Sequence, residues 1–315
     1  MKVNIKELPK ISERLSSGHR MCAGCGAPIV AKMVMMGTDK PLVVANATGC
    51  LEVATTIYPY TAWNTPWIHN AFENAAATIS GAETAYRALK KKGKIDKEAK
   101  FLAFGGDGGT YDIGLQSLSG ALERGHDFVY VCYNNEAYMN TGIQRSSATT
   151  MGASTTTSPS GKVIPGKKVF PKDLTGICAA HGIPYAAQGS ISNWKDLISK
   201  AKKAFDTPGP AFINVLSPCP PGWKYSPEKT YEIAKVSVET KIWPLYEVEN
   251  GKWTITSSPR KVKPVKEWIE MQGRFRHLKR EENKHIIDNI QKWVDKGWQK
   301  LEKLQQISSE GEEKE

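Results

Sequence analysis

The chain has 315 residues, of which 40% are hydrophobic, and its formal net charge is +11. This length can bury one large core, or one core with an appendage. No apolar run approaches the roughly 20 residues that a membrane span needs, so we expect no membrane partner. The basic charge fits acidic partner subunits, the steering of an acidic electron carrier, or nucleic acid. Nucleic acid is the least favoured of these, because the lysines are dispersed rather than clustered with aromatic residues.

Strand-sized apolar runs alternate with helix-like segments through the first two thirds of the chain. The runs expected to be strands are 42–45, 101–104, 128–132, 185–187 and 211–216. The segments expected to be helices are 70–89, 112–123, 173–181 and 193–205. Strands that alternate with helices pair in parallel, so this order predicts an α/β fold that is doubly wound around a mostly parallel sheet.

Polar residues follow two neighbouring expected strands. Gly106, Asp107 and Gly108 follow the first, and Asn135 follows the next. The carboxyl ends of adjacent parallel strands meet at one edge of a sheet, so we expect Asp107 and Asn135 to lie close together. Glycines let a phosphate approach backbone N–H groups, and oxygen ligands beside a phosphate suit Mg²⁺. A Gly-Asp-Gly alone fits an ordinary polar turn, but its pairing with Asn-Asn one βαβ unit later resembles the thiamine diphosphate motif.

Four of the six cysteines lie in turn-like sequence that is rich in glycine or proline. Cys22 and Cys25 form a C-x-x-C, and Cys50 ends a Thr-Gly-Cys turn. Cys219 stands between two prolines. Thiolates in such turns can point at one shared site. The four cysteines therefore predict two disulfides, a zinc site or an iron–sulfur cluster.

Three observations bear on that choice. Residues 1–6 lack the apolar core of a secretory signal, so we expect a cytoplasmic protein, in which disulfides are disfavoured. A zinc ribbon would carry a second C-x-x-C, whereas one C-x-x-C with two scattered cysteines is compatible with a cluster. Cys132 lies in an apolar run and Cys178 in a helical pattern, so both are expected to be core thiols. Spacing favours iron–sulfur over zinc only modestly, and plain buried thiols stay an alternative for some of the four.

A thiamine diphosphate half-site and a four-cysteine set on one chain resemble the β subunit of 2-oxoacid:ferredoxin oxidoreductases. The resemblance covers about residues 18–278. It rests on the segments 18–26 (GHRMCAGCG), 45–50 (ANATGC), 66–70 (PWIHN), 106–108 (GDG) and 138–142 (YMNTG). The C-A-G-C-G-A-P and W-I-H-N forms look like the pyruvate and branched-chain branches of the family, and less like its 2-oxoglutarate branch.

This resemblance implies three cofactors: thiamine diphosphate, Mg²⁺ and a [4Fe–4S] cluster. Asp107 and Asn135 would bind Mg²⁺ through their side chains, and Ala137 through its carbonyl. Further contacts to thiamine diphosphate would come from Thr48, Gly49, Gly106 and Gly108. The cluster ligands would be Cys22, Cys25, Cys50 and Cys219. Asn140 and Cys50 are the implied catalytic residues: Asn140 would face the substrate end of the thiazolium, and Cys50 would place the cluster as first electron acceptor.

The resemblance also implies a reaction and partners. A 2-oxoacid, coenzyme A and oxidised ferredoxin would give an acyl-coenzyme A, CO₂ and reduced ferredoxin. Pyruvate is the first expectation as substrate, followed by branched-chain 2-oxoacids and then oxalate. The chain holds one diphosphate half-site and no ferredoxin-like cysteine run, so sister subunits would supply an aminopyrimidine-binding domain and the onward clusters. Two competing hypotheses are a non-redox thiamine diphosphate enzyme with structural zinc and a scaffold with a decayed site.

The regular pattern loosens after residue 217, which predicts two domains. Residues 1–240 would form the domain that binds thiamine diphosphate and the cluster, and residues 241–315 an irregular and helical extension. Trp243, Trp253 and Trp268 are expected to pack this extension rather than to bind a ligand.

Three segments lie outside the expected alternation of strands and helices. The charge-laced segment 280–304 carries an apolar stripe that must lie on its own domain or on a neighbouring subunit. The loop 146–162 is rich in Ser, Thr and Gly, and is expected to cover the active site or to meet another subunit. The polar end, 308–315, is expected to be frayed.

Overall fold

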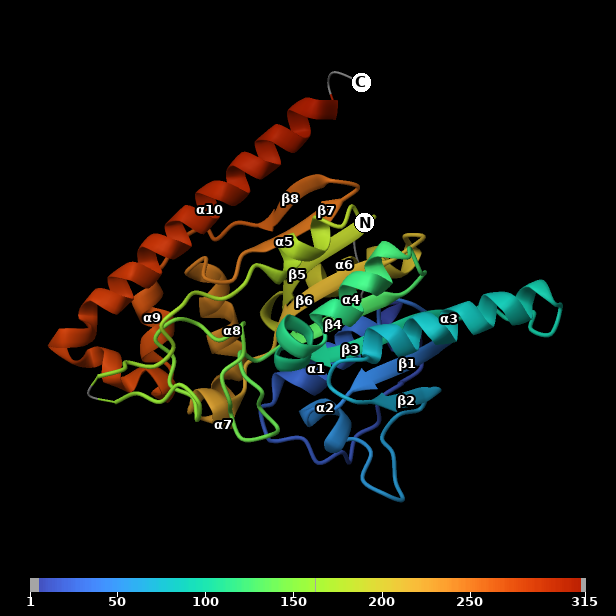
Figure 1. Cartoon of the computed structure of the whole chain (residues 1–315), viewed down its shortest axis with the longest axis horizontal. Coiled ribbons are helices and arrows are strands. Elements are labelled where there is room, and N and C mark those ends of the chain that lie inside the picture. The colour runs from blue at the N-terminus through green and yellow to red at the C-terminus, as the bar shows by residue number, and fades with distance from the viewer. Residues whose placement is uncertain (1–5, 162, 313–315) are drawn as a thin grey trace.

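The predicted sheet is the centre of the fold (Figure 1). The computed structural model describes residues 6–161 and 163–312, and within them eight strands form one sheet in the order β2-β1-β3-β4-β6-β5-β7-β8. The strands are β1 (Leu42–Ala47), β2 (Trp67–Asn70), β3 (Lys100–Gly106), β4 (Val129–Asn134), β5 (Tyr185–Ser190), β6 (Ala211–Leu216), β7 (Leu245–Glu249) and β8 (Lys252–Ser257). β1 to β6 pair in parallel, and β7 and β8 are antiparallel. The prediction of a doubly wound, mostly parallel α/β sheet is confirmed.

Helices cover both faces of this sheet. They are α1 (Gly26–Met35), α2 (Cys50–Val53), α3 (Ala75–Lys91), α4 (Leu115–Glu123), α5 (Leu174–Ala179), α6 (Trp194–Asp206), α7 (Pro220–Trp223), α8 (Thr230–Glu239), α9 (Val265–Glu270) and α10 (Lys284–Glu312). α1 and α6 contribute to the apolar core on one face, and α3, α4 and α5 to the core on the other. Every residue of β4 and β6 is buried, because helices cover both faces of these strands, which are mostly apolar rather than alternating.

Three strands were not predicted. β2 is a four-residue edge strand with two exposed residues, so it lacks the apolar run of a buried strand. β7 and β8 form a hairpin through Asn250 and Gly251, whose φ values of 48° and 85° fit the Asn-Gly turn that favours hairpins. The sequence did not predict this hairpin, which the C-terminal extension carries in addition to its helices. The division at residue 240 stays a prediction, although β7 and β8 continue the sheet beyond it.

The C-terminal segment forms one long helix, α10, which runs along the side of the molecule past β8 (Figure 1). The expected helix at 280–304 is confirmed, and its apolar stripe lies on its own domain. Ile286, Ile290 and Val294 are buried there in a cluster with α9. The helix continues to Glu312, so the expectation of a frayed end is wrong up to that residue, and residues 313–315 lie outside the described part.

The remaining expectations concern single side chains. Cys132 and Cys178 are buried core thiols, as predicted. Trp243 and Trp268 are buried, and Trp253 stacks on Tyr246, so the tryptophans pack the extension as expected. Among the described residues all six cysteines are free, which argues against the disulfide alternative. None of the helices in the described ranges has the length and apolarity to cross a membrane.

Candidate active site

The first part of the site lies where β3 and β4 end. These strands pair in parallel with Gly106 opposite Tyr133, so the residues that follow them are neighbours. The Asn135 backbone N–H donates to Asp107 Oδ1 at 3.0 Å. The two side chains that the sequence assigned to the metal therefore lie side by side at the carboxyl edge of the sheet, where ligands bind in open α/β folds.

Three oxygen-bearing groups meet at this edge: the Asp107 carboxylate, the Asn135 side-chain amide and the Ala137 carbonyl. The Asn135 Nδ2 donates to the Ala137 carbonyl oxygen at 3.0 Å and to Asp107 Oδ1 at 3.0 Å. Carboxylate, amide and carbonyl oxygens are the hard ligands that Mg²⁺ prefers. With the amide oxygen turned toward the other two, this donor set would hold Mg²⁺ beside a diphosphate.

The Asp107 carboxylate is fully buried, and burial raises its pKa to about 7. Ser146 Oγ donates to Asp107 Oδ2 at 2.5 Å, which opposes that rise by favouring the charged form. A bound divalent cation would also favour the charged carboxylate and would lower the pKa of Asp107 more strongly than Ser146 does. Ser146, the first residue of the predicted loop, therefore contacts the edge formed by Asp107, Asn135 and Ala137, which is called the metal edge below. Lys162, the last residue of the predicted loop, lies outside the described residues.

Around these oxygens lies a narrow cleft. Its lining residues are Thr48, Gly49, Cys50, Phe72, Gly106, Gly108, Gly109, Tyr133, Asn135, Ala137, Tyr138, Met139, Asn140 and Thr141. A Cβ at Gly108 would stand 2.5 Å from the Tyr138 ring, and one at Gly49 would stand 2.6 Å from Tyr133 Oη. These two positions therefore require glycine by close approach. Every residue that the sequence assigned to thiamine diphosphate lines this cleft except Asp107, which is buried against Asn135.

Cys50 and Asn140, the two expected catalytic residues, meet in this cleft. Cys50 is the first residue of α2, directly after the Thr48-Gly49 turn. Both residues line the cleft. Burial raises the pKa of the Cys50 thiol, and the nearby Asn140 amide opposes the rise. An amide donor near a sulfur can stabilise its charged form.

The four turn cysteines gather around one region. Cys219 is buried, Cys25 and Cys50 are half-buried, and Cys22 is exposed. Burial raises the pKa of Cys219, and the nearby Cys22, Cys25 and Cys50 raise it further. Backbone bonds join the turns, since the Gly26 N–H donates to the Pro218 carbonyl at 3.1 Å. Within residues 6–161 and 163–312, no three His, Cys, Asp or Glu side chains are arranged to hold a metal ion.

A tryptophan links the cysteine region to the metal edge. α7 follows Cys219 directly and ends at Trp223, which is fully buried. Trp223 Nε1 donates to the Asn135 carbonyl at 2.7 Å. A shift of the Cys219 turn would therefore move the backbone of Asn135, because the indole is enclosed and cannot absorb the movement.

Arg274 extends this link to the C-terminal wrap, which comprises residues 265–294. Its guanidinium pairs with the Glu136 carboxylate at 2.9 Å and lies 4.0 Å over the Trp223 ring. Both charged side chains are buried. Glu136 has φ of 63°, a left-handed conformation that is uncommon for a residue other than glycine. The ion pair thus holds the strained residue between the two metal-edge residues Asn135 and Ala137.

The sequence did not single out four of these residues: Ser146, Trp223, Arg274 and Glu136. Glu136 lies inside the Asn-Asn-Glu segment, so its position was a signal for a role beside the metal. Arg274 gave no local signal, because 138 positions separate it from Glu136 and only the fold brings the pair together. These four residues form a supporting layer around the expected site.

Known proteins that are similar to this chain place it in a family. Residues 47–215 match the family described as "Thiamine pyrophosphate enzyme, C-terminal TPP binding domain". The chain belongs to this class, and within it to the β subunits of 2-oxoacid:ferredoxin oxidoreductases. It is 54% identical to "Pyruvate synthase subunit PorB" of Thermotoga maritima, over 98% of this chain and 99% of that protein.

Two further relatives are matched over nearly their whole length. The chain is 56% identical to "Pyruvate synthase subunit PorB" of Methanocaldococcus jannaschii, over 92% of this chain and 97% of the relative. It is 44% identical to "Ketoisovalerate oxidoreductase subunit VorB" of Pyrococcus abyssi, over 94% of each. Because its relatives are subunits of these enzymes, the chain is a subunit of an oxidoreductase.

One solved structure supports the fold. It is "2-oxoglutarate:ferredoxin oxidoreductase from Magnetococcus marinus with 2-oxoglutarate, coenzyme A and succinyl-CoA bound", at a TM-score of 0.54. The match covers 70% of this chain and 79% of that chain at 20% identity, so it bears on the architecture alone.

Proposed function

We propose that the chain is the β subunit of a pyruvate:ferredoxin oxidoreductase, a pyruvate synthase. It would take part in the conversion of pyruvate, coenzyme A and oxidised ferredoxin to acetyl-coenzyme A, CO₂ and reduced ferredoxin. The observation that carries the proposal is the meeting of the Asp107 carboxylate, the Asn135 amide and the Ala137 carbonyl beside a glycine-lined cleft. Relatives named as pyruvate synthase subunits support the choice of pyruvate. A branched-chain 2-oxoacid is the second candidate, because a ketoisovalerate oxidoreductase subunit is 44% identical.

The metal edge would hold Mg²⁺ through Asp107, Asn135 and Ala137, and the cleft would hold thiamine diphosphate. When bound, thiamine diphosphate supplies the electron sink for decarboxylation of a 2-oxoacid. The chain's own contribution is to fix the ligands before the cofactor arrives. Ser146 orients the Asp107 carboxylate, while Trp223 holds the Asn135 carbonyl and Arg274 holds the side chain of Glu136, the next residue.

Cys22, Cys25, Cys50 and Cys219 would ligate a [4Fe–4S] cluster, the proposed first electron acceptor. Asn140 would act at the border of the two sites, because it lines the cleft together with Cys50. Hydrogen bonds to cluster sulfurs are one means by which proteins tune a cluster's potential. The competing zinc hypothesis predicts zinc and no acid-labile sulfide in the anaerobically purified complex, whereas the proposal predicts iron and sulfide.

The chain would work in the cytoplasm with sister subunits, ferredoxin, coenzyme A and a 2-oxoacid. Its described residues contain one sheet and one diphosphate half-site, so a sister subunit would bring the aminopyrimidine-binding domain. The full chain alone, supplied with cofactor and reconstituted cluster, should therefore show no 2-oxoacid oxidation. Mixing with a subunit that carries such a domain should restore it, and turnover by the single chain at the rate of the complex would contradict this proposal.

The decisive experiment is an assay of the complex purified without oxygen. Pyruvate, 2-ketoisovalerate and oxalate are compared by kcat/KM, with coenzyme A and a viologen dye as acceptor. We expect the largest value for pyruvate and dependence on coenzyme A. A larger value for 2-ketoisovalerate would favour the second candidate, and the absence of dye reduction with every 2-oxoacid would exclude the proposed reaction.

A further inference from the structure

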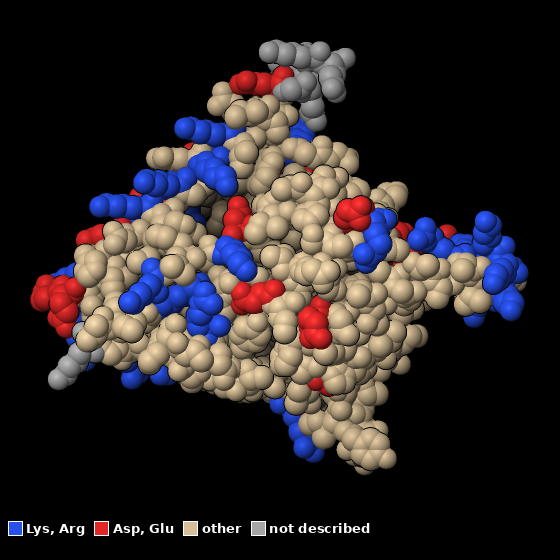
Figure 2. Space-filling model, in the orientation of Figure 1, with Lys and Arg blue, Asp and Glu red and all other residues tan. Residues whose placement is uncertain are grey.

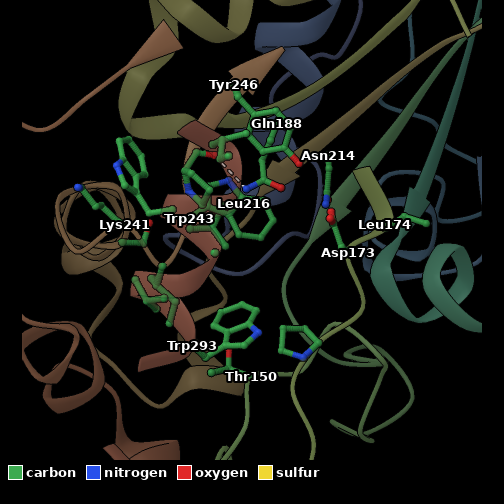
Figure 3. A pocket seen from close by; sticks show the side chains of 18 of the residues that line it. Thr150, Asp173, Leu174, Gln188, Asn214, Leu216, Lys241, Trp243, Tyr246 and Trp293 are labelled. Carbon is green, nitrogen blue, oxygen red and sulfur yellow. Dashed lines mark hydrogen bonds between the residues drawn. The ribbon is translucent and has the colours of Figure 1, made fainter. Parts of the chain in front are cut away.

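Two places away from the metal edge combine a hollow with titratable side chains. The first is a cavity of about 380 Å³ beneath α10, which Figure 3 shows with its aromatic walls. Lysines of its lining are already engaged within the chain, Lys300 with Asp173 and Lys241 over a tryptophan ring. The second lies beside the cofactor cleft, where His69 contacts Thr48, a residue that lines the cleft. His69 belongs to the Trp-Ile-His-Asn segment, to which the sequence assigned no role.

Thr48 follows β1 directly and is fixed by the edge strand β2. Its backbone N–H donates to the Asn70 carbonyl at 2.8 Å, and its hydroxyl donates to the same carbonyl at 2.7 Å. The hydroxyl oxygen of Thr48 also lies 3.0 Å from His69 Nε2. The hydroxyl of a residue in the cleft lining therefore contacts both a fixed carbonyl and a titratable ring.

The other ring nitrogen of His69 faces a carboxylate. His69 Nδ1 lies 3.6 Å from Glu52 Oε1, which is an ion-pair distance rather than a hydrogen bond. Glu52 is buried in α2, and its Oε1 accepts from Thr56 Oγ1 at 3.3 Å. The imidazole also stacks on Trp67, with ring centroids 6.2 Å apart and 27° between the planes. The ring is thus oriented by a carboxylate on one side and a hydroxyl on the other, as a catalytic base is when a third group holds it.

These neighbours suit His69 in both of its protonation states. When the ring is charged, Nε2–H donates to the Thr48 oxygen, Thr48 donates to the Asn70 carbonyl, and Nδ1–H faces Glu52. When the ring is neutral, the Thr48 hydroxyl turns and donates to Nε2, and Nδ1 keeps its hydrogen toward Glu52. The Asn70 carbonyl accepts from the Thr48 backbone N–H in either state. His69 can therefore gain or lose a proton without leaving these groups unpaired.

His69 also reaches the surface of the chain. Its side chain is 53% exposed on the edge strand β2, whereas that of Glu52 is 10% exposed. Figure 2 shows mostly uncharged side chains over β2. Imidazole is the side chain that exchanges protons with water most readily near neutral pH. The contact between Thr48 and His69 therefore joins the cofactor cleft to solvent through one hydroxyl and one ring.

We propose that Thr48 and His69 form a proton relay that carries a proton out of the cofactor cleft. The relay rests on the function proposed above. In that reaction a pyruvate anion and the thiol of coenzyme A give acetyl-coenzyme A, CO₂, two electrons and one proton, because the thiol hydrogen has no place in the thioester. Thr48 is the member that faces the cleft, and His69 is a positioning residue that acts through it.

Each proton in the relay has a donor and an acceptor. The thiol S–H bond breaks, its electron pair stays on sulfur, and its proton goes to Thr48 Oγ1. The proton that Thr48 held moves at the same time to His69 Nε2, which was the acceptor of the neutral ring. His69 becomes an imidazolium that faces the Glu52 carboxylate, and loss of one proton to water returns the imidazole. A hydroxyl is too weak a base to take the proton alone, so the transfer depends on the ring behind it.

The test compares variants of the complex purified without oxygen, with pyruvate, coenzyme A and a viologen dye. His69→Gln keeps a group that can hydrogen bond to Thr48 but cannot carry a proton. We expect kcat to fall at least about ten-fold, with the KM for pyruvate and the bound thiamine and iron unchanged. Imidazole added to the buffer should restore part of kcat, because the exposed site admits a small base. The matched control His285→Gln, at an exposed position of α10, should keep the wild-type kcat and should not respond to imidazole.

Substitutions at Thr48 locate the relay. Thr48→Ser keeps the hydroxyl and should keep most of kcat, whereas Thr48→Val should lower it. The double variant with His69→Gln should be no slower than Thr48→Val alone, because both changes interrupt one relay.

The relay is overturned if His69→Gln keeps the wild-type kcat, if imidazole restores nothing, or if the losses in the double variant add. It is also overturned if His69→Gln loses thiamine or iron, since His69 would then have a structural role. These outcomes concern the relay alone, because they are measured against an active wild type. A wild-type complex that reduces no dye with any 2-oxoacid would instead exclude the proposed reaction, and the relay with it.

Discussion

The cofactor cleft and the C-terminal wrap use their polar groups in different ways. In the cleft, Asn135 and Ala137 line a space that a ligand can enter, beside the buried Asp107 carboxylate. In the wrap, the Arg274 guanidinium is enclosed by aromatic rings and paired with Glu136. The first region presents polar groups to a ligand site, and the second uses a buried ion pair to join distant segments of the chain. We therefore expect substitutions in the cleft to remove binding and those in the wrap to remove stability as well.

The sharpest test of that contrast is Asp107→Ala. It removes the anionic ligand of the proposed metal edge, so phosphate charge would stay uncompensated and thiamine diphosphate should be lost almost completely. Iron content and thermal stability should change little, because the carboxylate is buried at some cost to the fold. Bound thiamine and iron are measured in the purified complex.

Asp127→Ala is a matched control for Asp107→Ala, because Asp127 precedes β4 at the opposite end of the strand from the metal edge. It should keep both cofactors. Normal thiamine occupancy in Asp107→Ala would contradict the assignment of the metal edge.

The six cysteines also fall into two groups, four that are proposed to bind a cofactor and two that pack in the core. Serine at Cys22, Cys25, Cys50 or Cys219 should lower iron content and suppress dye reduction, since each would remove a cluster ligand. Serine at the core thiols Cys132 and Cys178 should keep the iron and carry a packing cost only. Iron and sulfide analysis separates the two groups, and a need for Cys132 or Cys178 in place of one of the four would refute the ligand set.

The sequence predicted the cleft better than the wrap, for a physical reason. Asp107 and Asn135 each follow a strand, and parallel pairing alone brings them together. The inner strands were evident because they are apolar throughout. Arg274 meets Glu136, and Trp223 meets the Asn135 carbonyl, only after distant segments pack, and no local pattern encodes these contacts. The β7–β8 hairpin was missed although its Asn-Gly turn is a local signal.

Arg274→Met tests whether the wrap controls the cleft. Leaving Glu136 buried and unpaired should lower the free energy of unfolding by about 3–5 kcal/mol. It should also weaken thiamine diphosphate binding, because Glu136 is the strained residue between Asn135 and Ala137. Thermal unfolding and cofactor Kd are measured on the complex.

A double variant separates the two effects of Arg274. Adding Glu136→Gln to Arg274→Met removes the unpaired charge, so stability should return in part. The affinity for thiamine diphosphate should not return, because the ion pair that held the turn is still absent. Full recovery of both would mean that the pair has a structural role only and does not position the metal edge.

The smallest expected effect concerns Lys167, whose ammonium group donates to the carbonyls of Ser147 and Thr149 in the loop over the metal edge. Burial lowers the pKa of Lys167 to about 8, below its unfolded value of about 10.4. Below pH 8 both states hold the proton, so the penalty of the buried charge is fully present. Between about pH 8 and pH 10.4 the folded state has lost the proton while the unfolded state keeps it, so the free energy of unfolding should rise with pH. Denaturation of the wild type and of Lys167→Met at pH 7 and pH 9.5 isolates this rise, because other groups titrate alike in both. Parallel changes in the two proteins would show that Lys167 does not titrate between pH 7 and pH 9.5, and that its charged ammonium is kept on the carbonyls of Ser147 and Thr149.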